Sequence, residues 1–158
     1  MVKKNKEYDN YLNEIDHYYK TSNWLYKTFF YKSSKGMHHG YFEKDTKSQE
    51  DAIINLNNTI INLTNVNKNH KLLDAGCGVC GTAIHIAKKT GAKVEGITIT
   101  KSQVKHSKKN INKEKVNHLV NVSLQDFTKT NFPNNHFDVV YGIESICHAY
   151  PKSAFLKE

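Results

Sequence analysis

Apolar residues follow two different spacings along the chain, and the change falls close to residue 66. Before this point they recur every three to four positions, which is the period of an amphipathic helix. After it they form short runs that are typical of buried strands. The helical spacing predicts helices over residues 7–20, 24–30 and 48–63, with a break at 21–23. The apolar runs predict strands over residues 71–75, 92–99, 119–124 and 137–141.

Helical patterns separate these strands, at residues 82–90 and 101–115, and a further helix is expected to begin near Ser145. Strands that alternate with helices form parallel sheets with right-handed crossovers. We therefore predict an α/β fold with an N-terminal helical cap or lid over residues 1–66 and a Rossmann-like domain over residues 67–158. Ligands of such sheets bind at the C-terminal ends of the strands. The residues expected there are Asp74, Thr98, Asp126 and Glu144.

The first predicted strand runs into a glycine-rich turn, because residues 72–83 read LLDAGCGVCGTA. A strand, a glycine turn and a helix in this order let the backbone pass close to a nucleotide-like ligand. The glycines lack the Cβ atoms that would collide with it. Their spacing also fits the G-x-G-x-x-G pattern of dinucleotide sites, so a nicotinamide-dependent oxidoreductase is an alternative reading of the turn.

Asp74, at the end of this strand, favours a different ligand class. A dinucleotide places its pyrophosphate at the helix N-terminus, where the helix dipole attracts anions. A carboxylate just before the first glycine repels that group but suits a cationic ligand with hydrogen-bond donors. The sulfonium and amino group of S-adenosylmethionine (SAM) have this chemistry. We therefore expect Asp74 to face a ligand, with a cap of the loop as the structural alternative.

Side chains at the next two strand ends extend this hypothesis. Thr98 stands where an acidic residue would hold the ribose hydroxyls of an adenosine ligand, and Gln103 can share that role. Asp126 can accept a hydrogen bond from the adenine amino group while the ring of Phe127 covers the base. The structural alternative is that Thr98 is an ordinary strand residue and that Asp126 only belongs to a turn.

Glu144 and His148 follow the fourth predicted strand, four positions apart. A helix starting at once would place them on one face as an acid and base pair, or they would simply cap it. The segment after the fourth strand lacks the N/D-P-P-Y/F pattern that binds planar amino groups of bases or of glutamine. This counts against methylation of a nucleobase nitrogen or a protein amide.

Length and composition limit the class of protein and its cellular location. A chain of 158 residues, 38% of them hydrophobic, suits one small globular domain. No run approaches the ~18–20 apolar residues of a membrane span, and the N-terminus lacks the apolar segment of a signal peptide. We expect a cytoplasmic protein with no integral membrane segment. Its cysteines, Cys77, Cys80 and Cys147, are expected to be reduced, and we predict no metal site.

The formal net charge of +8 raises the question of nucleic acid binding. Every basic side chain other than histidine is a lysine, and the lysines are spread from Lys3 to Lys157. Bidentate phosphate recognition by arginine is therefore absent from this sequence. We predict a solvated basic surface and no nucleic acid partner.

Together these motifs resemble those of the class I SAM-dependent methyltransferases. Residues 72–81 are similar to the first motif of that family. Residues 96–100 with Gln103 are similar to the second motif of the branch that contains sterol C-methyltransferases, tocopherol methyltransferases and cyclopropane fatty acid synthases. In that branch Thr and Gln replace the usual ribose-binding acid. Residues 141–149, YGIESICHA, are similar to a sterol methyltransferase segment.

Further elements extend the resemblance over nearly the whole chain. Asp126 with residues 132–133 and 137–138 matches the D-A…P-F-P…F-D register of the family. Residues 39–41 are similar to its H-x-G-Y element, and Tyr19 with residues 22–23 to its Y-D-x-S-N motif. Two positions depart from the pattern. Cys80 replaces a usual glycine and Phe127 a commoner alanine, and both are expected to narrow the pocket.

The resemblance implies SAM as cofactor, S-adenosylhomocysteine (SAH) as product, and methyl transfer to a small apolar or amphipathic molecule. Transfer to carbon is favoured over nitrogen or oxygen. The catalytic residues implied are Glu144, His148 and Tyr19, and Tyr19, Tyr41 and Trp24 would form an aromatic wall. The cofactor-binding residues implied are Asp74, Gly76, Cys77, Gly78, Thr98, Ile99, Gln103, Asp126, Phe127 and Glu144. The alternative is a catalytically silent SAM-binding or scaffold subunit of a split methyltransferase.

Members of that family continue past the fourth strand with further strands that complete the sheet. This chain stops at Glu158. The fourth strand would then be an open edge, and open edges invite pairing. We therefore expect a fragment, a split enzyme needing a second chain, or a chain completed by homo-oligomerisation.

Overall fold

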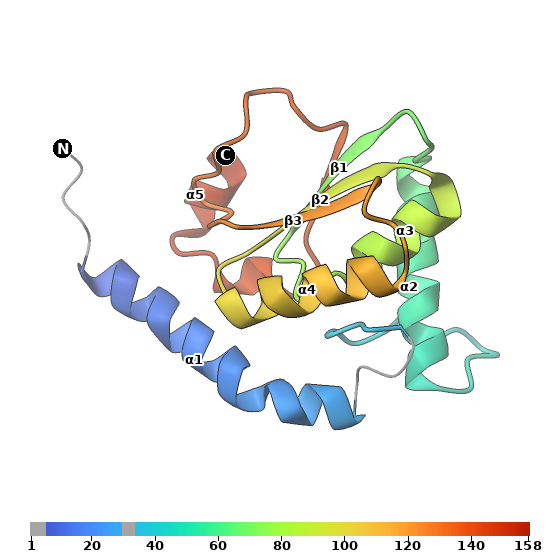
Figure 1. Ribbon diagram of the computed structural model, residues 1–158, viewed down its shortest axis with the longest axis horizontal. Coiled ribbons are helices and arrows are strands. Elements are labelled where there is room, and N and C mark those ends of the chain that lie inside the picture. The colour runs from blue at the N-terminus through green and yellow to red at the C-terminus, as the bar shows by residue number, and fades with distance from the viewer. Residues whose placement is uncertain (1–5, 30–33) are drawn as a thin grey trace.

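A computed structural model describes residues 6–29 and 34–158, and for residues 23, 24 and 26–29 it describes the backbone alone. Helices and strands alternate in the second part of the chain, as Figure 1 shows. In chain order the elements are α1 (Lys6–Phe29), α2 (Gln49–Thr64), β1 (Lys71–Ala75), α3 (Gly81–Thr90), β2 (Lys93–Thr98), α4 (Lys101–Lys113), β3 (Val120–Leu124), β4 (Val139–Tyr141), the 3₁₀ helix η1 (Ile146–His148) and α5 (Lys152–Lys157).

The four strands form one parallel sheet in the order β3-β2-β1-β4. Strand β1 lies inside the sheet, where Leu72 pairs with Val94 of β2 on one side and with Val139 of β4 on the other. The prediction of a partial parallel sheet in a Rossmann-like α/β fold is confirmed.

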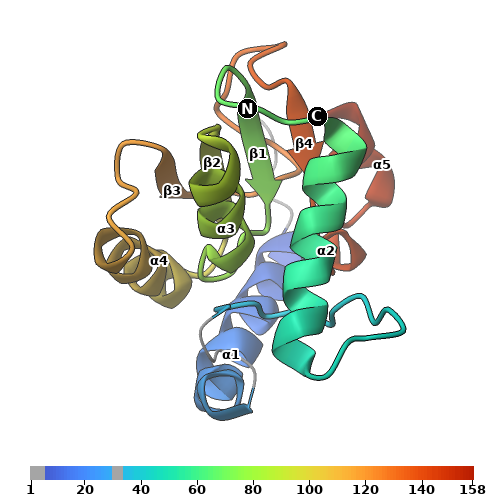
Figure 2. The same ribbon diagram turned by 90° about the vertical axis from the view of Figure 1, so that its right-hand side faces the viewer.

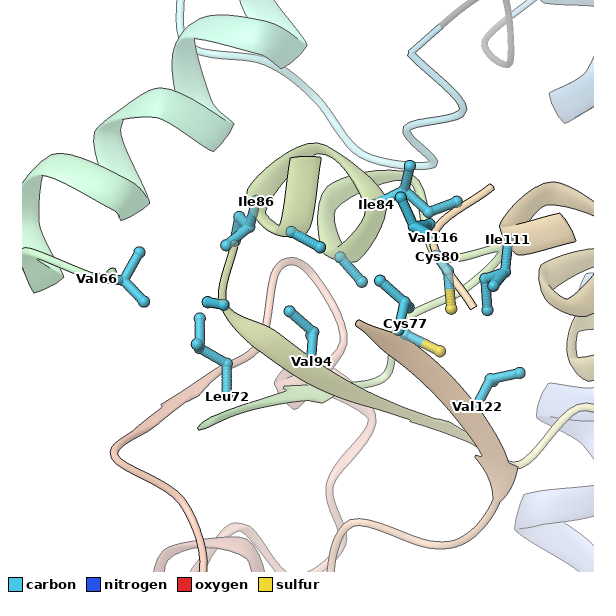
Figure 3. Packing of buried hydrophobic residues seen from close by; sticks show 14 residues of the cluster. Val66, Leu72, Cys77, Cys80, Ile84, Ile86, Val94, Ile111, Val116 and Val122 are labelled. Carbon is cyan, nitrogen blue, oxygen red and sulfur yellow. The ribbon is translucent and has the colours of Figure 1, made fainter. Parts of the chain in front are cut away.

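Helices α2, α3 and α4 supply one continuous core against one face of this sheet. Figure 3 shows the side chains of Leu72, Val94 and Val122 pointing from the strands toward Ile84 and Ile86 of α3. These residues are at most 5% exposed. Burial of this apolar stripe drives the amphipathic helices onto the sheet.

The opposite face and the β4 edge are less well covered. Val140 of β4 is 54% exposed, and the exposed Asn121 of β3 donates to the Glu95 carboxylate of the neighbouring strand β2 (3.0 Å). Asp138, just before β4, accepts from the backbone N of Lys71 (2.7 Å) and so ties β4 to β1. Strand β4 is thus an edge of the sheet that the described residues form, as predicted, and Asp138 has a structural role at this edge.

Helix α1 is continuous, so the predicted break at residues 21–23 is wrong. The polar residues 21–23 favour a helix stop, but none of them is proline or glycine, the residues that interrupt helices most strongly. Thr21 donates its hydroxyl to the carbonyls of His17 (2.9 Å) and Tyr18 (3.0 Å). This bonding satisfies the side chain within the helix, so the helix continues through the polar stretch.

A helix begins next to Ser145, as predicted, but it is only the short 3₁₀ helix η1, and α5 begins after Pro151. Glu144 adopts a left-handed backbone conformation with φ +52°, which ends regular structure at that point. Pro151 then lacks the N–H that a continuing helix needs and restricts the residue before it. Glu144 and His148 therefore do not share a helix face.

Helix α1 lies beyond the C-terminal ends of the strands. In Figure 2 the arrow of β1 points toward α1, which crosses below the sheet. Among the helices of the described residues, none is long and apolar enough to cross a membrane.

Candidate functional site

A cavity lies between the C-terminal ends of the strands and helix α1. The space between its walls, counted out to its open mouth, is about 1040 Å³. Every side chain predicted for cofactor binding or catalysis lines it. These are Tyr19, Asp74, Gly76, Cys77, Gly78, Thr98, Ile99, Gln103, Asp126, Phe127, Glu144 and His148.

The glycine turn after β1 forms the floor of the cavity. The backbone N–H groups of Gly76 and Cys77 both donate to the carbonyl of Ile97 (3.0 and 2.9 Å), which ties the turn to β2. Gly76 has φ +92°, and a Cβ atom there would lie 2.3 Å from Cβ of Ser145. Only glycine combines this backbone conformation with such a close approach.

Cys80 lies in the same turn but does not line the cavity. Its backbone is left-handed (φ +64°), and its side chain is fully buried in the core between Ile84 and Ile111, as Figure 3 shows. The expectation that Cys80 narrows the pocket is therefore wrong. Cys77 and Cys80 are free thiols. The hydrogen bond to Cys80 and burial raise the pKa of the Cys77 thiol well above its ordinary value, so Cys77 is a weak nucleophile.

Asp74 is a carboxyl group at the wall of the cavity with only 4% of its surface exposed. Burial raises its pKa from 3.8 to about 7. Tyr141, its register partner on β4, offsets a part of this rise in the pKa of Asp74. The Tyr141 hydroxyl does not meet the geometry of a direct hydrogen bond. No cation among the described residues forms an ion pair with Asp74. A buried carboxyl of this kind favours a ligand that brings a positive charge.

Thr98 and Gln103 are joined by a hydrogen bond at the end of β2. The Thr98 hydroxyl donates to Oε1 of Gln103 (2.6 Å) and accepts from the backbone N of Thr100 (3.2 Å). The Gln103 amide nitrogen faces Sδ of Met37 at 3.8 Å. Both side chains are buried, and each keeps capacity for a further hydrogen bond. The pair can therefore accept from, or donate to, vicinal hydroxyl groups.

Asp126 and Phe127 line the cavity beyond β3. The ring of Phe127 packs edge-on against Phe155 of α5, with the ring centroids 5.4 Å apart. The Asp126 carboxylate accepts a hydrogen bond from Tyr8 of α1 (2.8 Å), a residue 118 positions away. This side chain was not predicted. In the sequence, only the helical spacing of Tyr8 with Ile15 and Tyr19 indicates that it lies on the same helix face as Tyr19.

Tyr19 and His148, both predicted as catalytic, are in direct contact. The Tyr19 hydroxyl lies 3.2 Å from Nε2 of His148. Burial raises the pKa of Tyr19 to about 12, while burial and the nearby Lys152 lower the pKa of His148. Tyr19 is therefore a neutral phenol beside a neutral imidazole, and it donates to Nε2 in the His148 tautomer that carries its proton on Nδ1. Glu144 instead points at the loop before α2 and accepts from the backbone N of His39 (2.9 Å).

The loop over residues 34–39 lines the cavity through residues 35–38, and this role was not predicted. Met37 lies over the glycine turn, where a Cβ on Gly78 would be 2.9 Å from its sulfur. His38 is buried, and its Nε2 lies 3.2 Å from the Thr82 hydroxyl of α3. Of the predicted aromatic wall, Tyr19 lines the cavity and Tyr41, which is 52% exposed, does not, while the prediction for Trp24 falls on a side chain outside the described residues.

A family model described as mycolic acid cyclopropane synthetase matches residues 6–155 of the chain. Similar curated proteins include 24-methylenesterol C-methyltransferase 3 of Arabidopsis thaliana, 41% identical over 103 residues. That match covers 65% of this chain and 29% of the relative. Sterol 24-C-methyltransferase ERG6B of Gibberella zeae is 34% identical over 141 residues, covering 89% of this chain and 36% of the relative. The chain thus spans about a third of the length of these two relatives.

Solved structures share the fold. The [4+2]-cyclase SpnF superposes with a TM-score of 0.85 at 23% identity, covering 92% of this chain and 54% of that one. Mycolic acid cyclopropane synthase CmaA1 complexed with SAH and CTAB gives a TM-score of 0.74 at 21% identity, covering 84% and 45%. The parallel sheet, the glycine turn and the ordered motifs agree with the family match over nearly the whole chain. This chain therefore belongs to the mycolic acid cyclopropane synthetase family, a branch of the SAM-dependent methyltransferases.

Proposed function

We propose that this polypeptide binds SAM in the cavity and transfers its methyl group to a small apolar or amphipathic molecule. Carbon is the favoured acceptor atom, with nitrogen or oxygen as alternatives. The observation that carries the proposal is Asp74, a buried carboxyl beside the glycine turn without an ion-pair partner among the described residues. The sterol C-methyltransferases among its relatives, and a fold neighbour complexed with SAH, support the same chemistry.

The residues present fit this cofactor. Asp74 would bind the amino group of the methionine part, and the close approach at Gly76 would admit its backbone. The Thr98–Gln103 pair would hold the ribose hydroxyls, while Asp126 and Phe127 would hold and cover the adenine. Cys77, Gly78 and Ile99 would line the remaining contact surface.

SAM supplies an electrophilic methyl group when bound. The chain would then orient the acceptor near this group, and orientation alone contributes strongly to such reactions. Glu144, between the cavity and the 34–39 loop, would hold a polar group of the acceptor. Tyr19 is placed to take a proton from the acceptor while it passes its own proton to Nε2 of His148. The neutral imidazole is ready to receive it.

Isothermal titration calorimetry of the chain with SAH tests cofactor binding directly. We expect saturable binding with one site per chain, and heat changes no larger than dilution would contradict the proposal. A fluorescence titration with NADH tests the dinucleotide alternative. We expect no saturable change, because the charge of Asp74 opposes a pyrophosphate at the glycine turn.

Replacing Thr98 with valine should weaken SAH binding about five- to tenfold, because valine keeps the shape but removes the hydroxyl that orients Gln103. Thr90→Val is the matched control, since Thr90 ends α3 away from the cavity and bonds only within its own turn. Calorimetric titration of both variants gives the comparison. Equal affinities for the two variants would show that Thr98 does not contact the ribose.

Cofactor binding without methyl transfer is the second candidate function. It is favoured by the fold match to a cyclase, because one fold can carry different reactions. Transfer of a labelled methyl group from SAM to a panel of sterols, fatty acids and small amines separates the two. Binding of SAH without transfer to any acceptor, even after addition of any partner chain captured with the protein, would favour the silent subunit.

The β4 edge is the basis for a proposal about assembly. Val140 is half-exposed on this edge strand, and an unpaired parallel edge in this fold is ordinarily covered. We infer that another strand pairs with β4, from further polypeptide, from a second copy or from a partner chain. Size-exclusion chromatography with light scattering tests the last two. A stable monomer that stays well folded at high concentration would contradict completion by oligomerisation.

A further inference from the structure

The Asp126 carboxylate is held by three donors that come from both sides of the cavity mouth. Its Oδ1 accepts from the backbone N (2.8 Å) and the hydroxyl (2.7 Å) of Thr128, two residues further along the same loop. Its Oδ2 accepts from the hydroxyl of Tyr8 (2.8 Å), which belongs to helix α1. Side chain and loop are therefore fixed by α1 as well as by their own turn.

The remaining hydrogen-bonding capacity of the carboxylate is on Oδ2. A carboxylate oxygen accepts about two hydrogen bonds, so Thr128 fills Oδ1 while Tyr8 leaves one position on Oδ2. Tyr8 and Asp126 both line the cavity, so the carboxylate lies at its wall. One further donor can therefore reach the carboxylate from the cavity.

The Tyr8 hydroxyl is a dependable donor to this carboxylate. Burial, the largest effect, raises the pKa of Tyr8 to about 12, so the hydroxyl keeps its proton throughout the neutral range. The Lys129 ammonium lies 6.0 Å from the centroid of the ring and holds it from another side. The phenol thus has a defined position over the loop that carries Asp126.

We propose that Tyr8 is a positioning residue for the recognition of the purine 6-amino group by Asp126. The proposal rests on the SAM-binding function above. With Tyr8 in place, the carboxylate is held in one orientation, and its open position on Oδ2 faces the base. Without the hydroxyl, the carboxylate keeps only the bonds from its own loop and can turn away from the base. Tyr8 would thereby contribute to the choice of adenine over purines that lack the amino group.

Two ligands and two variants test this role by calorimetry. The ligands are SAH and its purine riboside analogue, in which hydrogen replaces the 6-amino group. The variants are Tyr8→Phe and Tyr11→Phe. Tyr11 is the matched control because its hydroxyl, on the same helix, donates to the backbone carbonyl of His148 (3.2 Å) and not to Asp126. Circular dichroism of both variants checks that helix α1 is kept.

We expect Tyr8→Phe to weaken SAH binding about three- to tenfold, the effect of losing one hydrogen bond. Binding of the analogue should stay unchanged, so that discrimination between the two ligands falls by the same factor. Tyr11→Phe should bind both ligands as the unchanged chain does. Unchanged SAH binding by Tyr8→Phe overturns the proposal, and so does an equal loss for both ligands, which would indicate only a general closing role of α1. Failure of the unchanged chain to bind SAH overturns the proposed function itself.

Discussion

Replacing Asp74 with asparagine should weaken SAH binding about 20- to 100-fold at pH 8, while the ligand-free fold stays at least as stable. Asparagine keeps the shape of the side chain and removes its charge. The loss in binding corresponds to one hydrogen bond between a carboxylate and a cationic donor. The ligand-free variant should be at least as stable as the unchanged chain, because a side chain that is only 4% exposed no longer has to carry a charge.

The pH dependence of SAH binding is an independent test of the role of Asp74. The ammonium of SAH stays charged near neutral pH, so binding needs the ionised form of Asp74. With a pKa of about 7 in the ligand-free state, the carboxyl is protonated in most molecules at pH 6. Binding should therefore be about tenfold weaker at pH 6 than at pH 8. Asp74→Asn should lose this dependence, and calorimetry at both pH values measures it.

Stability without ligand should change in the opposite direction. The pKa of Asp74 is raised above its unfolded value, so its contribution to stability is complete at low pH and is lost as pH rises toward 7. The ligand-free chain should therefore melt at a lower temperature at pH 8 than at pH 6, and Asp74→Asn should show a smaller difference. An Asp74→Asn variant that binds SAH normally, with the original pH profile, would exclude Asp74 from the binding site.

Replacing Leu72 with alanine should lower the free energy of unfolding by about 3 kcal/mol, the usual cost of a large cavity in a core. Leu72 is 0% exposed and lies in the middle of the sheet, between β2 and β4. Its side chain packs in the cluster beneath α3, where no neighbour can fill the gap without moving the sheet. Urea denaturation followed by circular dichroism measures the change.

Leu63→Ala is the matched control, because it makes the same chemical change on α2 at a residue that is 79% exposed. It should change the free energy of unfolding by less than about 0.5 kcal/mol. Similar losses for the two leucines would show that the β1 side chains are not packed as described. The comparison also tests the fold without any ligand.

The sequence alone was sufficient for the elements that depend on local patterns. The apolar run of β1, the helical period of α2 and the glycine turn each follow from neighbouring residues, and the structure has them close to the predicted bounds. Asp74 could be placed at a strand end for the same reason, because a parallel strand delivers its last side chain to the C-terminal edge. Gly76 shows its constraint directly, in a backbone that only glycine readily adopts.

The tertiary structure decided the contacts that join distant parts of the chain. Tyr8 meets Asp126 and Tyr19 meets His148 because the first part of α1, which the pattern already predicts as helix, packs across the cavity. Glu144 bonds to His39 because its left-handed backbone, in the segment after β4, does not start a regular helix. Hydrophobic period and turn chemistry act over a few residues, so they determine the elements. Which hydroxyl reaches which carboxylate is set by how those elements pack, and for that the sequence carries no local signal.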